Sequence, residues 1–566
     1  MTVATQDVGL AAQEGQMRRA ITWKDAFWVA SGAPAFVLFS IGGLAGTVGN
    51  LAIVLWAISM TMGFIQSFTY AEIAGLYPNK SGGASVYGAA AWQRYGKLIA
   101  PLSVWCNWVA WTSVLSLGSS IAAAYILNSL APVPAAGSAE VQAWIAAHAA
   151  EVGALAADQQ VAQAVAALTP TVREWTLVAG HIGPVGFSLN SAFFIGAALM
   201  LLVFSIQHRG ISGTASVQKW LGLAVIVPMA IVGLVPILLG KVDVNNFIPL
   251  ALPSGDWTLA SWTVILAGLF IAGWSTYGFE TAVCYTREFT NPARDTFKAI
   301  FYSGLLCFAL FVLVPFTFQG VLGLSGVTDP TIVDGSGVAR ALAFMVGGGP
   351  IVLHLLIIMI IMAVLLSIMT AMAGSSRTLY QGSIDGWLPK YLGRLNHHGA
   401  PTNAMWTDLV FNLFVLAVAV SDATSFFFLL AVSNCCYIIF NFLNLNAGWI
   451  HRIDSPDKPR PYRAPFIILA TGTVLSFVNA ILMGAGAKIW HPSALWAGLA
   501  TALMIIPVFC FRHYVQDRGR FPNENADFAQ PRRAGILPYL ALAGGLGLVL
   551  LANYIFVLPT PPAPPT

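Results

Sequence analysis

The sequence predicts an all-α integral membrane protein, and composition and the length of its apolar stretches support this. Charged residues make up only 9% of the 566 residues, the hydrophobic fraction is 57%, and the mean hydropathy is +0.74. A soluble domain carries about 25% charged residues, so a soluble fold would lack the polar surface that it needs. The apolar residues instead form stretches of about 20 or more, long enough for a helix to cross a bilayer.

Thirteen apolar stretches meet this length requirement, and we expect each of them to be a membrane-spanning helix. They lie at 23–48, 51–76, 98–129, 185–206, 217–240, 259–289, 298–322, 349–378, 402–421, 424–447, 464–486, 493–512 and 534–558.

The first stretch is interrupted near its middle by Ser31, Gly32, Ala33 and Pro34. Proline in a helix interior removes one backbone hydrogen bond and clashes with the preceding turn, and glycine weakens the helix further. Unpaired backbone groups are costly in hydrocarbon, so an unwound segment survives only inside protein or beside a wet cavity.

The sixth stretch has an equivalent interruption at 272–278, which contains Gly273, Trp274, Ser275 and Tyr277. The ends of broken helices direct partial charges at whatever lies between them. A matched pair of breaks in the two halves of a membrane protein indicates the binding site of a transporter. We therefore expect the two breaks to share one cavity near the middle of the bilayer.

The basic residues indicate the orientation of the chain. If the N-terminus is cytoplasmic, 23 of the 27 Lys and Arg residues fall on cytoplasmic segments or span ends. Positive residues are enriched on the cytoplasmic side of membrane proteins, so this orientation is the predicted one. Because the basic residues are spread over many loops, the net charge of +4 does not indicate a nucleic-acid partner.

The sequence indicates no cofactor, no metal site and no enzyme activity. The six cysteines lie within apolar stretches without metal-ligand spacing, and we interpret them as packing residues. Glycine-rich pieces such as 347–349 follow no strand and precede no Lys-Ser/Thr pair, so they do not resemble phosphate-binding loops.

Three segments lie outside the apolar stretches. Residues 1–22 form a polar N-terminal segment, expected on the cytoplasmic side, without the features of a signal peptide. Residues 131–184 form an alanine-rich insertion outside the membrane, where we expect short amphipathic helices that cover the protein. Residues 559–566 form a proline-rich tail, which is not helical.

Glu280 directly follows the second break and is the main candidate for proton chemistry. A carboxylate inside the membrane is costly and is a functional hypothesis by default. It could be a proton-sensitive gating group below the site, or a cap on the inner half-helix, where free N–H groups stabilise a negative charge. We expect Glu280 to combine these two roles.

Four other ionisable residues near or within spans have structural explanations. We expect Glu72 to pair with Arg94 or Lys97, and Asp408 also to have a pairing role. His354 is interpreted as a helix histidine with a hydrogen bond, and Lys219 as a residue whose amine reaches the interface.

Aromatic residues surround the predicted site. Trp105, Trp108 and Trp111 follow one another at helical spacing in the third stretch, a pattern that more often indicates packing. Trp274 is the exception, because it lies within the break itself. An aromatic wall suits an amine or ammonium group through cation–π attraction.

Three motifs resemble those of the amino acid–polyamine–organocation (APC) superfamily of permeases. They lie at 71–83 (AEIAGLYPNKSGG), at 278–294 (GFE, then EFTNPAR) and at 376–401 (SRTLY, DGWLP and GAP). The resemblance implies two inverted five-helix repeats over 23–450, with broken helices one and six. About three additional helices follow in 451–558.

The resemblance also assigns roles to positions in the breaks. It implies that N–H groups around Gly32, Ala33 and Pro34 bind a substrate carboxylate, and that carbonyls from Gly273 to Ser275 bind the amine. Trp274 takes the place of an aromatic lid, Glu280 that of a pH-responsive glutamate, and Trp111 that of a substrate contact. The family's Gly-x-Gly is absent from the first break, and span five carries no lysine at the place where some proton-coupled members have one.

The leading hypothesis is a secondary transporter of an amino acid or small amine in the cell membrane, working by alternating access as a proton symporter or an exchanger. Its partners would be the substrate, protons and membrane lipid, with the chain acting as a monomer or homodimer. The alternatives are a transporter of another small polar solute, such as a nucleobase or choline-like cation, and a transporter-derived ligand sensor.

Overall fold

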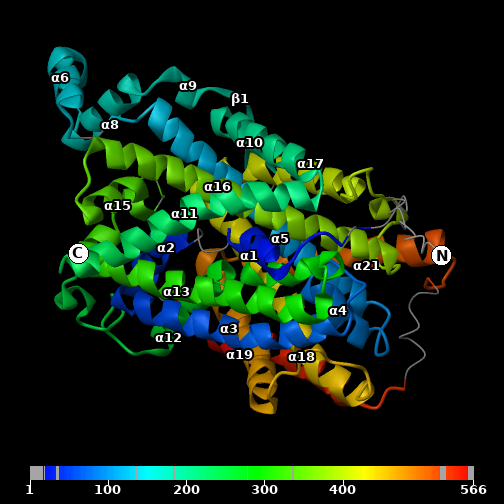
Figure 1. Cartoon of the computed structure of the whole chain (residues 1–566). Helices are drawn as coiled ribbons and strands as arrows, with labels where there is room; N and C mark the ends of the chain where they lie inside the picture. Colours follow the sequence, from blue (N-terminus) through cyan, green and yellow to red (C-terminus); the bar gives the residue numbers. More distant parts are fainter. Residues whose placement is uncertain are drawn as a thin grey trace, which may run out of the picture.

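The computed structural model is a bundle of helices that run close to one common axis (Figure 1). It describes residues 17, 19–32, 37–134, 137–153, 155–182, 185–276, 278–333, 335, 337–522 and 531–558, and all structural statements refer to these residues. We call the end of the bundle that carries α4 (Ala84–Trp92) the α4 face. The opposite end, which carries α6 (Ala139–Ala147), is the α6 face; the two lie right and left in Figure 1.

Eleven helical segments in the described part of the chain are long and apolar enough to cross a membrane. One of them, Ser40–Gly75, contains parts of two predicted spans, which meet at a turn around Gly49 with φ of 62°. The predicted fourth span is a shorter apolar helix, Ser191–Gln207. With these two adjustments each of the thirteen predicted spans corresponds to helical structure, so the prediction of an all-α membrane protein is confirmed.

The first half of the helical core begins with a broken helix and continues with four spans. Its elements are α1 (Trp23–Ala30), α2 (Val37–Val48), η2 (Gly49–Leu51), α3 (Ala52–Gly75), α4, α5 (Ile99–Leu130), α10 (Ser191–Gln207) and α11 (Ile211–Leu238). A short segment, η3 (Val244–Phe247), precedes the second half.

The second half repeats this order of elements. They are α12 (Leu259–Thr276), η4 (Gly278–Glu288), α13 (Pro292–Val327), α14 (Pro330–Val333), α15 (Val338–Val346), α16 (Pro350–Ile384), η5 (Lys390–Gly393), α17 (Thr402–Ala419) and α18 (Ala423–Asp454).

The two halves pack against each other through helices that hold the same place in each half. α3 lies against α13, and α5 lies against α16. Within the first half α1 packs on α11, and within the second half α12 packs on α18. These contacts are compatible with the two inverted five-helix repeats that the family resemblance implies.

Further helices pack on one side of this core. They are α19 (Phe466–Trp490), α20 (Ala494–Leu503), α21 (Ile505–Cys510), the π-helical η6 (Phe511–Gln516) and α22 (Leu537–Ile555). α19 contacts α12, α18 and α22.

The segment between α5 and α10 contains helices and a β-hairpin. Its elements are α6, α7 (Ala149–Val152), α8 (Ala157–Leu168), α9 (Thr171–Glu174), β1 (Thr176–Ile182) and β2 (Val185–Asn190). β1 and β2 are antiparallel, with Ala179 opposite Ser188.

The expectation that residues 185–190 open the fourth span was therefore wrong. The sequence from Val185 to Asn190 alternates apolar and small or polar residues, a period of two that suits a strand. The Asn190 side chain then accepts a hydrogen bond from the Phe193 backbone N–H at 3.0 Å and caps α10.

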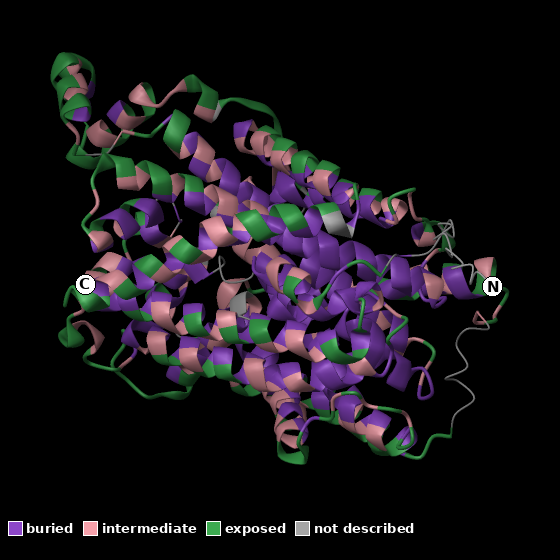
Figure 2. Ribbon diagram, viewed as in Figure 1, coloured by how far each residue is buried: buried purple, intermediate pink, exposed green. Residues whose placement is uncertain are grey.

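Burial identifies α5 as a central element. Figure 2 shows buried residues filling the interior of the bundle and exposed residues along its outer helices. In α5, 83% of the most apolar window is buried inside the protein, against 22% in α22. A helix enclosed on all sides can present polar side chains to partners on several neighbours, and α5 does so.

Candidate functional site

The first helix break lies where it was predicted. α1 ends at Ala30, Ser31 and Gly32 form a turn, and α2 begins at Val37. The Ser31 hydroxyl donates to the Trp28 carbonyl at 2.6 Å, and the same carbonyl accepts the Ser31 backbone N–H at 3.2 Å. Ala33 and Pro34 lie outside the described residues.

Carbonyls at the end of α1 are held by side chains of α16 and α11. Thr370 Oγ1 donates to the Val29 carbonyl at 2.5 Å, and Ser367 Oγ donates to the Gly32 carbonyl at 2.6 Å. Gln218 Nε2 approaches the Val29 carbonyl from α11 at 3.4 Å. Backbone groups in hydrocarbon need such internal partners, so these hydroxyls allow α1 to end inside the membrane.

This contact explains why position 32 is glycine. A Cβ added to Gly32 would lie 2.6 Å from Thr370 Oγ1 and 2.7 Å from the Leu366 carbonyl oxygen. Real Cβ atoms do not approach so closely, so any larger residue would separate α1 from α16 and break the hydroxyl bonds.

The second break differs from its predicted position. The α-helix α12 continues through Gly273, Trp274 and Ser275 to Thr276, so the expectation of unwound backbone at 272–276 was wrong. The physical reason is that this stretch contains no proline, and one glycine costs a helix only about 1 kcal/mol. Tyr277 lies outside the described residues, as does the Ser275 side chain.

Beyond Tyr277 the chain continues as a 3₁₀ segment of 11 residues, η4. Runs of 3₁₀ helix longer than about four residues are uncommon, and within a helix they often mark a functional hinge. An α-helix, α12, and a 3₁₀ helix, η4, thus meet near the middle of the sixth span.

Trp274 connects three helices at this junction. Its indole N–H donates to Ser433 Oγ on α18 at 3.1 Å, and Ser433 donates to the Ala110 carbonyl on α5 at 3.0 Å. The ring also lines a small cavity of about 30 Å³. The other lining residues are Ser40, Gly43, Leu44, Ile121, Ile271, Phe426, Phe427, Leu430 and Trp490. Side chains of α2 and α12 therefore share one cavity.

Glu280 is a buried carboxylate without a hydrogen bond among the described residues. Only 4% of the residue is exposed, and neither carboxylate oxygen has a partner there that meets hydrogen-bond geometry. The Trp111 indole and the Tyr437 hydroxyl lie near it, and Cys284 and Cys307 are close enough to interact electrostatically. No ion pair to Glu280 occurs in the described part of the chain.

The structure thus brings three of the predicted site residues into one region. Trp111 on α5 and Trp274 on α12 pack in the same apolar cluster, and Trp111 lies near Glu280 on η4. In contrast, Ser31 is hydrogen-bonded to Trp28 on α1, and Gly32 is hydrogen-bonded to Ser367 on α16.

One predicted ion pair was wrong. Glu72 pairs with Arg452 at 2.6 Å and with Arg460 at 3.3 Å, whereas Arg94 pairs with Asp454. The end of α18 and the loop after it bring these distant arginines to α3, which spacing along the sequence cannot reveal. The Ala464 backbone N–H also donates to Glu72 at 2.8 Å.

Two further interpretations are consistent with the geometry. His354 Nδ1 lies 2.7 Å from the Pro350 carbonyl of its own helix, and Lys219 is exposed beside Trp220. The expected pairing role of Asp408 was wrong, because this fully buried carboxylate binds uncharged donors on α5 and α16 and forms no ion pair with a described residue.

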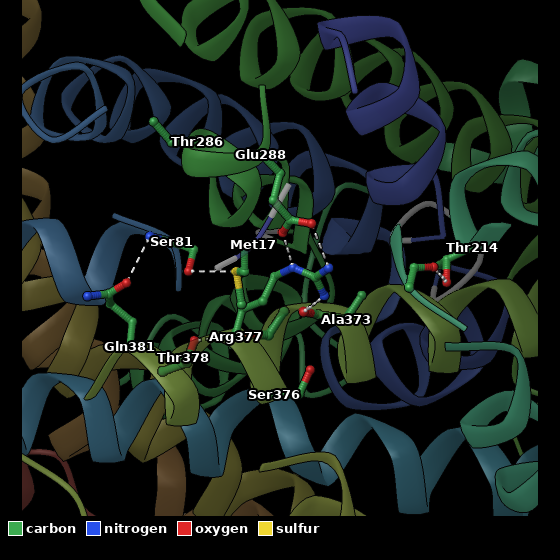
Figure 3. A network of polar contacts seen from close by, with 12 residues as sticks. Met17, Ser81, Thr214, Thr286, Glu288, Ala373, Ser376, Arg377, Thr378 and Gln381 are labelled. Carbon is green, nitrogen blue, oxygen red and sulfur yellow. Dashed lines mark hydrogen bonds and ion pairs between the residues drawn. The ribbon is translucent and has the colours of Figure 1, made fainter. Parts of the chain in front are cut away.

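Sequence reasoning missed a buried network between Glu280 and the α4 face (Figure 3). Arg377 on α16 pairs with Glu288 at the end of η4, with Nη2 to Oε2 at 3.1 Å, and its guanidinium lies over the Tyr285 ring. The Glu288 carbonyl accepts the N–H groups of Ala20 and Ile21 at 2.9 and 3.2 Å. The residue that pairs with Arg377 thus also holds the backbone of Ala20 and Ile21 at this end of the bundle.

Neighbouring contacts join further segments to the network around Arg377 and Glu288. Lys80 pairs with Asp385 at 3.0 Å, and Gln381 accepts the Ser81 backbone N–H at 3.2 Å. Ser81 in turn donates to the sulfur of Met17 (Figure 3). The available sequence signal was the presence of opposite charges in motifs at the ends of spans two, six and eight.

Comparison with known families agrees with this architecture. A sequence model described as amino acid permease matches residues 21–510. The chain belongs to the amino acid permease family. The match contains both breaks, Glu280 and the Arg377–Glu288 pair, whereas α22 lies beyond it. Because the family consists of transporters, the protein is not an enzyme.

Individual relatives are distant. The branched-chain amino acid permease BcaP of Lactococcus lactis is 24% identical over 339 residues, which cover 57% of this chain and 70% of the relative. The lysine-specific permease LysP of Escherichia coli is 23% identical, covering 56% and 67%. The polyamine transporter PUT1 of rice is 24% identical, covering 48% and 47%.

Proposed function

We propose that this permease is a secondary active transporter that moves an amino acid or a small amine across the cell membrane. The observation that carries the proposal is Glu280, a buried carboxylate without an ionic partner among the described residues, placed at the junction of α12 and η4. Family membership and the relatives' names, which refer to branched-chain amino acids, lysine and polyamines, support this substrate class.

The substrate would bind between the two breaks. α1 and α12 both end inside the membrane, and the C-terminal end of a helix carries a partial negative charge that attracts an amine. The opposite partial charge at the start of α2 would attract a carboxylate, in keeping with the role that the family resemblance gives to the N–H groups around Gly32, Ala33 and Pro34. Trp274 would cover the substrate on the side of the α6 face.

Transport would follow alternating access around this site. Trp274 and the small cavity beside it would lie between the site and the α6 face, and the network of Arg377, Glu288 and the backbone of Ala20 and Ile21 would lie toward the α4 face. Opening the side chains on one of these two sides at a time would expose the site to one side of the membrane.

Glu280 would make this cycle sensitive to protons. Burial opposes its charged form, whereas the N–H groups at the start of η4 favour it. A group held between such opposing effects responds to small changes in hydration when a barrier opens. Proton symport and exchange both remain compatible with this role.

The basic residues support a cytoplasmic α4 face. Lys24, Lys80, Arg294 and Arg394 are among those at this end of the bundle, and the sequence assigns 23 of the 27 Lys and Arg residues to the cytoplasmic side if the N-terminus is cytoplasmic. Positive residues face the cytoplasm in most membrane proteins, so the α6 face with its hairpin and short helices would lie outside.

Uptake by purified protein in proteoliposomes tests the function. A panel of radiolabelled amino acids and amines, offered with and without an imposed proton gradient, should include at least one substrate that accumulates. Saturable binding without any accumulation would instead indicate a ligand sensor. Accumulation of a nucleobase or choline, with none of the amino acids or other amines, would contradict the proposed substrate class.

A further inference from the structure

A second buried carboxylate, Asp408, lies in the helix scaffold away from the proposed substrate site. It is on α17, about two turns from the start of that helix, and has no solvent exposure. Three uncharged groups donate to it: Trp108 Nε1 and Thr112 Oγ1 from α5 to Oδ1, and Ser375 Oγ from α16 to Oδ2. The Trp108 and Ser375 bonds measure 2.9 and 2.5 Å.

No described cation neutralises this carboxylate. The charged and titratable groups on the elements packed around α17 have other partners or positions. Two of these groups bind hydroxyls near α17: His208, which follows α10, contacts Thr402, and Tyr391 on η5 contacts Thr407. Arg377 on α16 pairs with Glu288, and Asp422 caps α18. Lys97 lies before the start of α5, near His513. β2 carries no charged residue.

An uncompensated carboxylate is an expensive way to connect three helices. Burying a charge without a counter-ion costs far more than burying an amide. Asparagine at position 408 would accept the same bonds from Trp108 and Thr112 and would donate to Ser375. A purely structural connection therefore does not require an ionisable group.

The hydrogen bonds around Asp408 can accept a proton without leaving any group unpaired. In the charged form, Ser375 donates to Oδ2. Ser375 Oγ also lies 3.3 Å from the Met372 carbonyl. When a proton binds Oδ2, the new O–H can donate to Ser375 Oγ, and the Ser375 proton can turn to the Met372 carbonyl. One proton is gained from water, the hydrogen bond between Asp408 and Ser375 reverses its direction, and the Ser375 hydroxyl donates to the Met372 carbonyl instead of to Asp408.

The same network holds α5 in place. Asn412, one turn after Asp408, donates to the Thr112 hydroxyl and accepts from Ser116 at 2.6 Å. Trp108, which binds Asp408, lies one turn before Trp111, which lies near Glu280. A change in the bonds to Asp408 therefore acts on the segment of α5 that borders the proposed site.

We propose that Asp408 is a proton-binding site of the scaffold, which positions α5 and thereby Trp111 opposite Glu280. Asp408 is a positioning residue, because the substrate would not touch it. Its effect on transport rests on the proposed function, whereas proton binding itself does not.

Infrared difference spectroscopy of the purified protein tests proton binding without any substrate. On acidification the wild type should gain the C=O band of a buried protonated carboxylic acid, shifted in D₂O. The band should persist in Glu280→Gln and in Glu280→Gln/Asp256→Asn, an exposed carboxylate control, and vanish in Glu280→Gln/Asp408→Asn, where titration of Glu280 cannot contribute. A band that persists in Glu280→Gln/Asp408→Asn, or its absence from Glu280→Gln, would overturn the proposal.

Ser375→Ala provides a second route if Asp408→Asn fails to fold. It removes the acceptor of the new O–H, so the acid band should move to higher frequency. An unchanged band in Ser375→Ala would show that the titrating acid lies elsewhere.

Transport then tests the positioning role. Asp408→Asn imitates the protonated network, so its maximal uptake rate should depend less steeply on pH than the wild-type rate, while the dependence due to Glu280 remains. Asp256→Asn should keep the wild-type profile. An unaltered pH profile in Asp408→Asn would overturn the link to α5, and absence of uptake by the wild type would instead reject the proposed function.

Discussion

Trp274 offers a quantitative test of the proposed site. Trp274→Phe keeps an aromatic wall and removes the indole donor to Ser433. A hydrogen bond between neutral groups is worth about 0.5–1.5 kcal/mol, so apparent affinity should fall about 2- to 13-fold. Trp274→Ala also removes the ring proposed to lie over the substrate amine, worth about 1–2 kcal/mol, for a total of about 1.5–3.5 kcal/mol or about 10- to 400-fold.

The assay is concentration-dependent uptake into proteoliposomes, with the amount of folded protein measured for each variant. Ser433→Ala is the matched variant, because it removes the acceptor of the same bond together with the bond to Ala110. The Trp274→Phe and Ser433→Ala effects should be non-additive in the double variant, since they share one interaction. Unchanged affinity and rate in Trp274→Ala would assign the ring to packing and refute its role as a cover.

Two further outcomes follow from the contacts around the breaks. Gly32→Ala should reduce uptake and lower the free energy of unfolding by about 1–3 kcal/mol, because its Cβ would clash with Thr370 and Leu366. Thermal unfolding of the detergent-purified protein checks the loss of stability. Arg377→Met should destabilise the protein by about 3–5 kcal/mol because it leaves Glu288 buried and unpaired, and adding Glu288→Gln should restore part of the loss. Wild-type stability in either single variant would contradict the corresponding contact.

The sequence was most informative where local chemistry decides the structure. The proline at position 34 and the glycine at position 32 identified the first break, and α1 ends within a residue of the predicted start. The lone glycine at position 273 was a weaker signal, because the helix tolerates it and continues to Thr276.

Partners far apart in the sequence could not be predicted in the same way. Asp408 binds residues of α5 about 300 positions away, and Glu72 binds Arg452 across 380 positions. Which of several polar residues meet depends on how the helices pack. The ionisable groups were therefore found, whereas most of their partners were not.

The central claim is that a permease site between the two breaks is gated by a titrating Glu280. Its most direct test is the pH dependence of uptake in wild-type and Glu280→Gln proteoliposomes. Glutamine keeps the shape of the side chain and removes its titration, so the account predicts a flattened pH profile with apparent substrate affinity changed less than the profile. A normal pH profile combined with lost substrate binding would make Glu280 a ligand contact and contradict the account.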